Sequence, residues 1–84
     1  MIIKFENALV MNVRRGSTRS GSDFAILKFL DTNTGEDYKI WCFGDAVGMA
    51  AFCSPMRNYN LTFSLIGDDQ NGGVRLVLDD AQAV

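Results

Sequence analysis

The sequence contains no histidine, and this absence narrows the possible functions more than any residue that is present. Histidine is the commonest general base in enzymes, and without it no pair of nucleophile and base can be named. The two cysteines, Cys42 and Cys53, cannot complete a four-ligand zinc site alone. No two acidic residues have a spacing typical of a catalytic or metal site. We therefore predict that the protein is not an enzyme and uses no metal and no cofactor.

Long apolar runs are also absent. No stretch approaches the roughly 18 apolar residues that a membrane-spanning helix requires. The first residues lack the basic segment of a signal peptide, and Glu6 and Asn7 interrupt any apolar segment. We therefore expect a cytoplasmic protein without membrane association, in which both cysteines are reduced and buried.

Positive charge is scarce overall but concentrated in one part of the chain. The net charge is −2, with eight basic and ten acidic residues. Residues 1–30 hold five basic and two acidic side chains, whereas residues 31–84 hold three and eight. The positive end of the molecule is therefore expected near Arg14, Arg15 and Arg19, and an anionic partner would be drawn there first.

With 84 residues, of which 48% are hydrophobic, the chain has room for one small domain, residues 1–84. Alternating apolar residues predict five strands, and the first of them is interrupted by Asn7, where we expect a bulge. Asp45 is the expected N-cap of a single short helix, which Pro55 prevents from continuing. The expected strands are residues 2–14, 23–30, 36–43, 59–66 and 74–78, the helix is 46–53, and the loops are 15–22, 31–35 and 67–73; residues 81–84 are expected to fray.

The chain is organised around residues 36–45, Glu-Asp-Tyr-Lys-Ile-Trp-Cys-Phe-Gly-Asp. A period of 2 places Asp37, Lys39, Trp41 and Phe43 on one face of a strand, opposite the apolar set of Tyr38, Ile40 and Cys42. Aromatic rings beside a cation on a solvent-facing strand suit the stacking of a nucleic-acid base and contact with its phosphate. Alternatively, the register is shifted by one residue and Trp41 and Phe43 fill the core.

The loop at residues 15–22 is rich in glycine and serine and carries two arginines. Such a loop can close on a phosphate backbone, although the same composition is typical of an ordinary soluble hairpin loop. The strand that follows has two largely apolar faces, with Ala25, Leu27 and Phe29 on one and Phe24, Ile26, Lys28 and Leu30 on the other. Lys28 is expected to share a face with Lys39 and Trp41.

The order strand, strand, strand, helix, strand, strand is that of the OB-fold, an all-β five-stranded Greek-key barrel. Within this order the sequence resembles the bacterial and phage single-stranded DNA-binding protein family. Three features carry the resemblance: Tyr38-Lys-Ile-Trp-Cys-Phe-Gly44 leading into the helix, the strand Tyr59-Asn-Leu-Thr-Phe63 after it, and the basic loop after Asn7-Ala-Leu-Val-Met-Asn-Val13. The resemblance implies a nucleic-acid-binding surface made of Lys28, Lys39, Trp41 and Phe43, with Arg14, Arg15 and Arg19 as a clamp.

We therefore expect a small OB-fold protein that binds single-stranded DNA with little sequence preference. Because one domain of this size makes few contacts, a homodimer or higher homo-oligomer is expected, with an exposed edge of strand one as the pairing surface. The rival interpretation is a protein-interaction or oligomerisation module that uses the same aromatic face, since aromatic residues also anchor protein interfaces. The net acidity and the acidic pair Asp68-Asp69 favour this rival, whereas the arginine cluster favours DNA.

Overall fold

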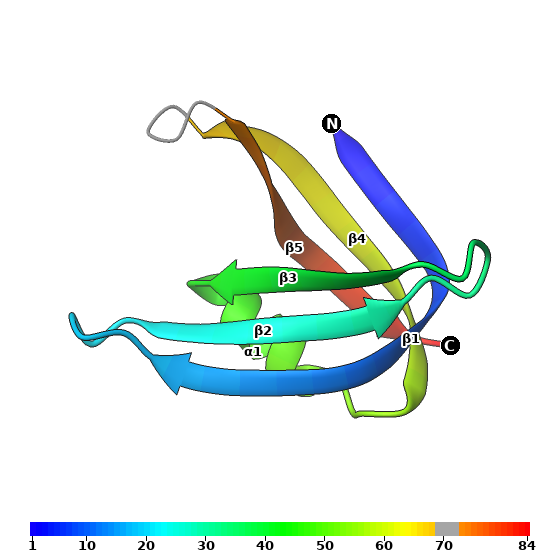
Figure 1. The fold of residues 1–84 in the computed structure, drawn as a ribbon, viewed down its shortest axis with the longest axis horizontal. Coiled ribbons are helices and arrows are strands. Elements are labelled where there is room, and N and C mark those ends of the chain that lie inside the picture. The colour runs from blue at the N-terminus through cyan, green and yellow to red at the C-terminus, as the bar shows by residue number, and fades with distance from the viewer. Residues whose placement is uncertain (69–72) are drawn as a thin grey trace.

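The computed structural model describes residues 1–68 and 73–84. It contains one short helix and five strands, and the helix lies between β3 and β4 as predicted (Figure 1). The elements are β1 (Ile2–Ser17), β2 (Asp23–Leu30), β3 (Asp37–Phe43), α1 (Asp45–Phe52), β4 (Arg57–Asp68) and β5 (Gly73–Ala83). The predicted loop at residues 67–73, including Asp69 of the acidic pair, falls mainly on residues 69–72, outside the described residues.

The five strands form one antiparallel sheet in the order β3-β2-β1-β4-β5. β1 is the central strand, so the prediction that it offers a free edge is wrong where Leu9 and Val10 pair with both neighbours. In the part of the chain that the structure describes, residues 12–17 of β1 pair with β2 alone. Over the described residues, β3 and β5 are the edges of the sheet.

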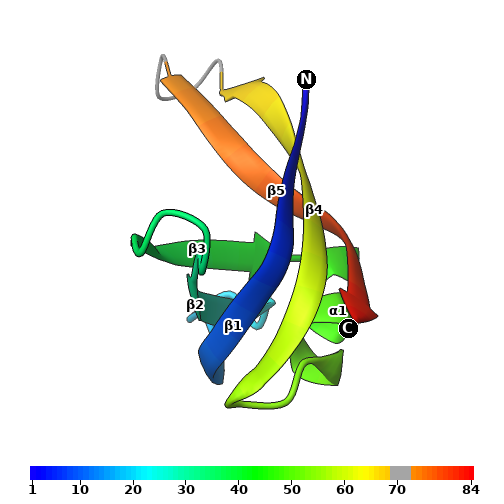
Figure 2. The same cartoon turned by 90° about the vertical axis from the view of Figure 1, so that its right-hand side faces the viewer.

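A sharp bend in β1 divides this sheet into two halves. Residues 2–5 pair with β4, whereas residues 12–17 pair with β2, and the two parts of β1 run in clearly different directions (Figures 1 and 2). Asn7 lies at the bend with a φ of 56°, and asparagine tolerates this left-handed conformation better than most residues. The predicted bulge at this residue is therefore confirmed.

Side chains from two other parts of the chain hold the bend. From β4, the Asn58 amide donates to Asn7 Oδ1 at 2.9 Å, and Asn60 Oδ1 accepts from the Asn7 N–H at 3.0 Å. From the turn between β2 and β3, Thr32 Oγ1 donates to the Asn7 carbonyl at 2.9 Å. The bend thus leaves unpaired the polar backbone groups that a regular ladder would have paired, and these side chains form hydrogen bonds with them instead.

The core lies between the two halves of the bent sheet. Phe29 from β2 stacks on Phe63 from β4 with ring centroids 5.7 Å apart, and Phe5 from β1 packs edge-on against Phe29 at 5.0 Å. Tyr38 from β3 stacks on Phe29 at 5.4 Å. One aromatic cluster therefore joins four strands, which buries the apolar face of both halves at once.

The face assignment of β2 and β3 is confirmed, and that of β1 is partly wrong. Ala25, Leu27 and Phe29 are fully buried, as expected. In β1 the sequence pattern predicts that Leu9 and Met11 share a face with Phe5, but Ala8 and Val10 are the fully buried residues. The reason is the bend at Asn7, because an irregular residue shifts the alternation and exchanges the two faces as far as Val10. A second irregularity between Val10 and Asn12 restores the predicted faces, so Val13 packs against the core.

The helix begins one residue earlier than expected. Its N-cap is Gly44, whose backbone (φ 60°, ψ −130°) suits glycine, so Asp45 lies in the first turn rather than at the cap. Ala46, Val47 and Ala50 face the core, whereas Phe52, expected on the apolar side, is 62% exposed. Among the described residues, no helix has the length and apolar character required to cross a membrane.

The last strand is longer than predicted. Residues 81–84 were expected to fray, yet β5 continues to Ala83, which pairs with Tyr59. The ladder with β4 contains an irregularity between Thr62 and Phe63, where Asp79 is left without a directly opposite residue. Because of this bulge, β5 stays paired with β4 across a polar stretch that lacks regular alternation.

Replacing Asn7 tests how much the bend contributes to stability. Asn7→Val should lower the free energy of unfolding by about 2 kcal/mol, because a β-branched residue is strained at positive φ and the bond from Asn58 is lost. Asn7→Gly, the control, keeps the backbone conformation and loses only the side-chain bond, so it should cost about 1 kcal/mol. Urea denaturation measures both. Equal losses for the two variants would show that the backbone conformation is not the limiting factor.

Candidate functional site

Three strands present one continuous surface on the side away from the core. Ile26 of β2 lies directly opposite Trp41 of β3 and Arg14 of β1, and directly opposed residues of an antiparallel pair point to the same side. The residue pairs two positions before and after these, Phe24 with Phe43 and Lys28 with Lys39, point to the same side. We call this surface the outer face; its residues are Asn12, Arg14, Gly16, Phe24, Ile26, Lys28, Lys39, Trp41 and Phe43.

One end of the outer face is aromatic. Trp41 and Phe43 are 50% and 49% exposed, which rules out the alternative register in which they fill the core. The rings of Trp41 and Phe43 are nearly parallel, 14° apart, with centroids separated by 6.4 Å. Phe24 lies beside Trp41, with centroids 5.2 Å apart. The three rings form an aromatic ladder that is open to solvent on one side.

The other end of the outer face is cationic. Lys28 and Lys39 are directly opposite each other on β2 and β3, and both are exposed. Like charges in this position destabilise a sheet. Within residues 1–68 and 73–84, no side-chain hydrogen bond involves Arg14, Lys28 or Lys39. These three cations are therefore available to an anionic ligand.

The arginines predicted to form one clamp lie in different places. Arg14 belongs to the outer face, whereas Arg15 pairs with Ala25, whose side chain points into the core, so Arg15 emerges on the opposite side of β1. Residues 15–17 belong to β1 rather than to the predicted loop, and only residues 18–22 connect the two strands. Arg19 lies in this connection and is exposed.

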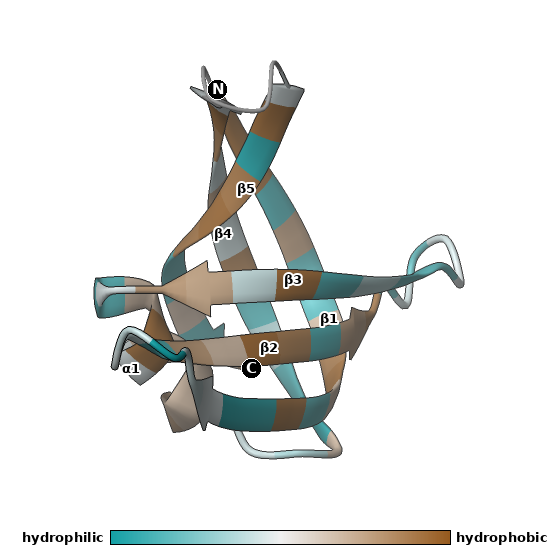
Figure 3. Cartoon of the chain, turned by 60° about the vertical axis from the view of Figure 1, so that its left-hand side comes forward, coloured by the Kyte–Doolittle hydropathy of each residue, from teal (hydrophilic) through white to brown (hydrophobic). Residues whose placement is uncertain are grey.

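The connection between β1 and β2 is held by its own hydrogen bonds. The Thr18 N–H donates to the Ser22 carbonyl at 2.8 Å, and the Ser22 N–H donates to Thr18 Oγ1 at 3.2 Å. Gly21 has a φ of 86°, which completes the tight turn. The loop at residues 18–22, which includes Arg19, therefore follows directly beyond the Gly16–Phe24 pair at the aromatic end of the outer face. Figure 3 shows this connection between β1 and β2 at the same end of the sheet as the arrowhead of β3.

Four residues of the outer face were not predicted as site residues: Asn12, Gly16, Phe24 and Ile26. Phe24 continues the aromatic ladder, and its ring lies over Gly16, where an added Cβ atom would come within 2.6 Å of the ring. Gly16 is therefore required for Phe24 to lie across the sheet. The apolar character of both faces of residues 24–30 was the available signal, since an apolar residue on an outward face needs a partner.

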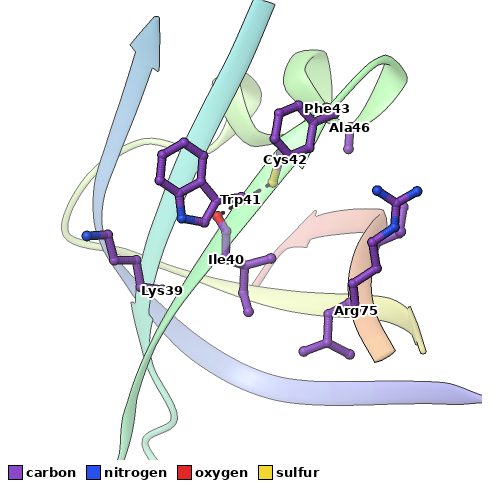
Figure 4. A pocket seen from close by; sticks show the side chains of 9 residues that line it. Lys39, Ile40, Trp41, Cys42, Phe43, Ala46 and Arg75 are labelled. Carbon is purple, nitrogen blue, oxygen red and sulfur yellow. Dashed lines mark hydrogen bonds between the residues drawn. The ribbon is translucent and has the colours of Figure 1, made fainter. Parts of the chain in front are cut away.

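A groove runs along the free edge of β3. It has a volume of about 500 Å³ and lies between residues 39–43 of β3 and residues 75–77 of β5, with Ala46 of α1 at one end. Arg75 extends from β5 beside the end of β3 that carries Phe43 (Figure 4). The groove thus adjoins the outer face along residues 39–43 of β3.

Beneath the aromatic ladder, both cysteines are buried and unpaired. Cys42 is 1% exposed and Cys53 is 4% exposed, as predicted, and Cys42 points inward on the strand where Trp41 points outward. Burial, with a smaller contribution from the nearby Cys53, raises the pKa of the Cys42 thiol to about 11. Burial also raises the pKa of Cys53. In the described part of the chain, no three cysteine, aspartate or glutamate residues cluster as a metal site would require.

No protein-family model matches this chain, and a search of curated proteins gave no match.

The buried thiols should be nearly inert in the folded protein. Because the thiolate is the reactive form, a pKa of about 11 at Cys42 leaves little of it at pH 8. We expect Ellman's reagent to label both thiols slowly in the native state and rapidly in urea, and the native rate should rise as the pH approaches 11. Rapid native labelling at pH 8 would contradict the assignment of Cys42 to the inward face.

Proposed function

We propose that this protein binds single-stranded DNA with little sequence preference, through the outer face of an OB-fold. The aromatic ladder would stack bases, and Arg14, Lys28 and Lys39 would contact phosphates. In this proposal the protein performs no chemistry and needs no cofactor.

The strand order supports the OB-fold part of the proposal. An OB-fold is a five-stranded, partly open Greek-key barrel that binds oligonucleotides on the face of strands 2 and 3. Here the sheet bends back on itself, its edge strands β3 and β5 contact each other, and the helix connects β3 to β4. The exposed aromatic and cationic residues lie on β2 and β3, the same two strands.

The observation that carries the proposal is the aromatic ladder beside a pair of opposed lysines. Stacking is tolerant of sequence because every base has a flat face, and each stacked base contributes about 1–3 kcal/mol. Exposed rings and opposed like charges are both unfavourable in the free protein. A ligand that is flat and negatively charged along its length relieves both costs at once, and single-stranded nucleic acid has these two properties.

A second candidate function is supported by the free strand edges. A protein partner could anchor on Trp41 and Phe43 and pair with the outer edge of β3, which has a strand neighbour on one side only among the described residues. The net charge of −2 is compatible with such a partner. A homodimer or higher assembly, which we also propose, would have the edge of β3 or residues 12–17 of β1 as its pairing surface.

Trp41, as the single tryptophan, reports directly on binding. Saturating oligothymidylate at low salt should quench its fluorescence, because a base would stack on the ring. Trp41→Ala should raise the dissociation constant by about 5- to 150-fold, which corresponds to about 1–3 kcal/mol. Since Trp41 is half exposed, the variant should lose less stability than the roughly 3–5 kcal/mol of a buried aromatic truncation.

Phe52→Ala is the matched control for this measurement. Phe52 is 62% exposed but lies on α1, away from the outer face, so its removal should leave the dissociation constant unchanged. Trp41 emission that does not respond to oligonucleotide would end the proposal of DNA binding through this face and favour a protein partner.

Arg14 and Arg15, which are neighbours on β1, can distinguish a direct phosphate contact from general electrostatic attraction. For single strands, each phosphate contact contributes about 0.7 to the slope of log affinity against log salt. Arg14→Ala should reduce this slope by about that amount, since Arg14 lies on the outer face. Arg15→Ala removes the same charge from the opposite side and should reduce the slope less. Equal reductions, measured by fluorescence anisotropy at several salt concentrations, would show that neither arginine makes a defined contact.

A further inference from the structure

The groove along β3 has the size and the lining of a binding site, and of its lining the proposed contacts on the outer face use only Lys39, Trp41 and Phe43. Its volume of about 500 Å³ lies within the range of about 300–1,000 Å³ that is typical of small-molecule pockets. Ile40, Leu76 and Val77 give it apolar walls, and Lys39 and Arg75 lie on its two sides (Figure 4).

The charged residues that line the groove favour an anionic ligand. Among the described residues, the lining contains two cations and no carboxylate, in a protein whose net charge is −2. Apolar walls with flanking cations match a ligand that has an uncharged flat part and a phosphate, which is the chemistry of a nucleotide. An acidic ligand without a flat apolar part would satisfy the cations and leave the walls unused.

The position of the groove connects it to the outer face. Both surfaces meet along β3, because Lys39, Trp41 and Phe43 belong to the outer face and also border the groove. The edge of β3 that faces the groove has no strand partner among the described residues. A flexible chain of nucleotides that crosses from β2 to β3 on the outer face would therefore reach the groove at its next step.

We infer that the groove between β3 and β5 is a second subsite for the same single strand, and that Arg75 contacts a phosphate there. This inference rests on the proposed function. It adds a contact from β5, which sequence analysis does not assign to the site, and it gives the strand a path over the edge of β3 rather than along β2 alone.

The test compares Arg75 with a second exposed arginine. Wild type, Arg75→Ala, Arg75→Lys and Arg57→Ala are titrated with labelled oligothymidylate of about 12 nucleotides, within the range of site sizes known for single OB-folds. Anisotropy is recorded at several salt concentrations, with Trp41 quenching as a separate report on the outer face. Arg57 is the control because it is also an exposed strand arginine but lies at the start of β4, outside the groove.

The expected result is that Arg75→Ala reduces the salt slope by about 0.7 and weakens binding, while Trp41 is still quenched at saturation. Arg75→Lys should restore most of the slope, because it restores the charge. The same reduction for Arg57→Ala, or none for Arg75→Ala, would overturn the subsite and leave the proposed function intact. Absence of both anisotropy change and Trp41 quenching in the wild type would overturn the proposed function, and the subsite with it.

Discussion

The bend at Asn7 is the constraint on which the rest of the structure depends. A single long strand pairs with β4 before the bend and with β2 after it, so one chain segment belongs to both halves of the sheet. The halves can then close over a shared aromatic core, in which Phe5, Phe29 and Phe63 meet. An unbent strand would leave one apolar face of a flat five-stranded sheet exposed to water, at a cost proportional to its area.

The bend also determines which surface remains outside. Once the core takes Ala25, Leu27 and Phe29 from β2, the alternation of the strand leaves Phe24, Ile26 and Lys28 on the opposite side. The outer face is therefore a consequence of burying the inner one. Its side chains stand on paired strands rather than on loops, and such positions are held more rigidly, which reduces the ordering cost of binding.

Much of this arrangement was predictable from the sequence because β2 and β3 alternate regularly. The bounds of β2, the end of β3 at Phe43 and the outward position of Trp41 all match the predictions. The inward positions of Ala8 and Val10 were not predictable, because the change of face at Asn7 depends on hydrogen bonds with side chains that are distant in sequence, those of Asn58, Asn60 and Thr32.

Contacts between strands account for the remaining differences between the sequence predictions and the structure. Phe24 joins the site through its packing against Trp41 and across Gly16, neither of which is visible in the pattern of its own strand. Arg14 and Arg15 are adjacent in sequence, yet the ladder with β2 places them on opposite sides of the sheet. The polar stretch at the end of β5 is a strand because β4 pairs with it through a bulge, and Ser64 donates a hydrogen bond to Asp79 there.

The distribution of charge explains how an acidic protein can offer a site for an anion. At an ionic strength of 0.15 M, interactions between exposed charges are screened beyond about 8 Å, so a ligand on the outer face responds mainly to the charges beside it. Those charges are Arg14, Lys28 and Lys39, and Asp37, the next residue along the same side of β3, is a single carboxylate beside three cations. The acidic residues elsewhere then lower the affinity of the rest of the surface for nucleic acid. The negative net charge and the positive charge of the outer face would together confine an anionic strand to that face. Its binding would weaken steeply as the salt concentration increases.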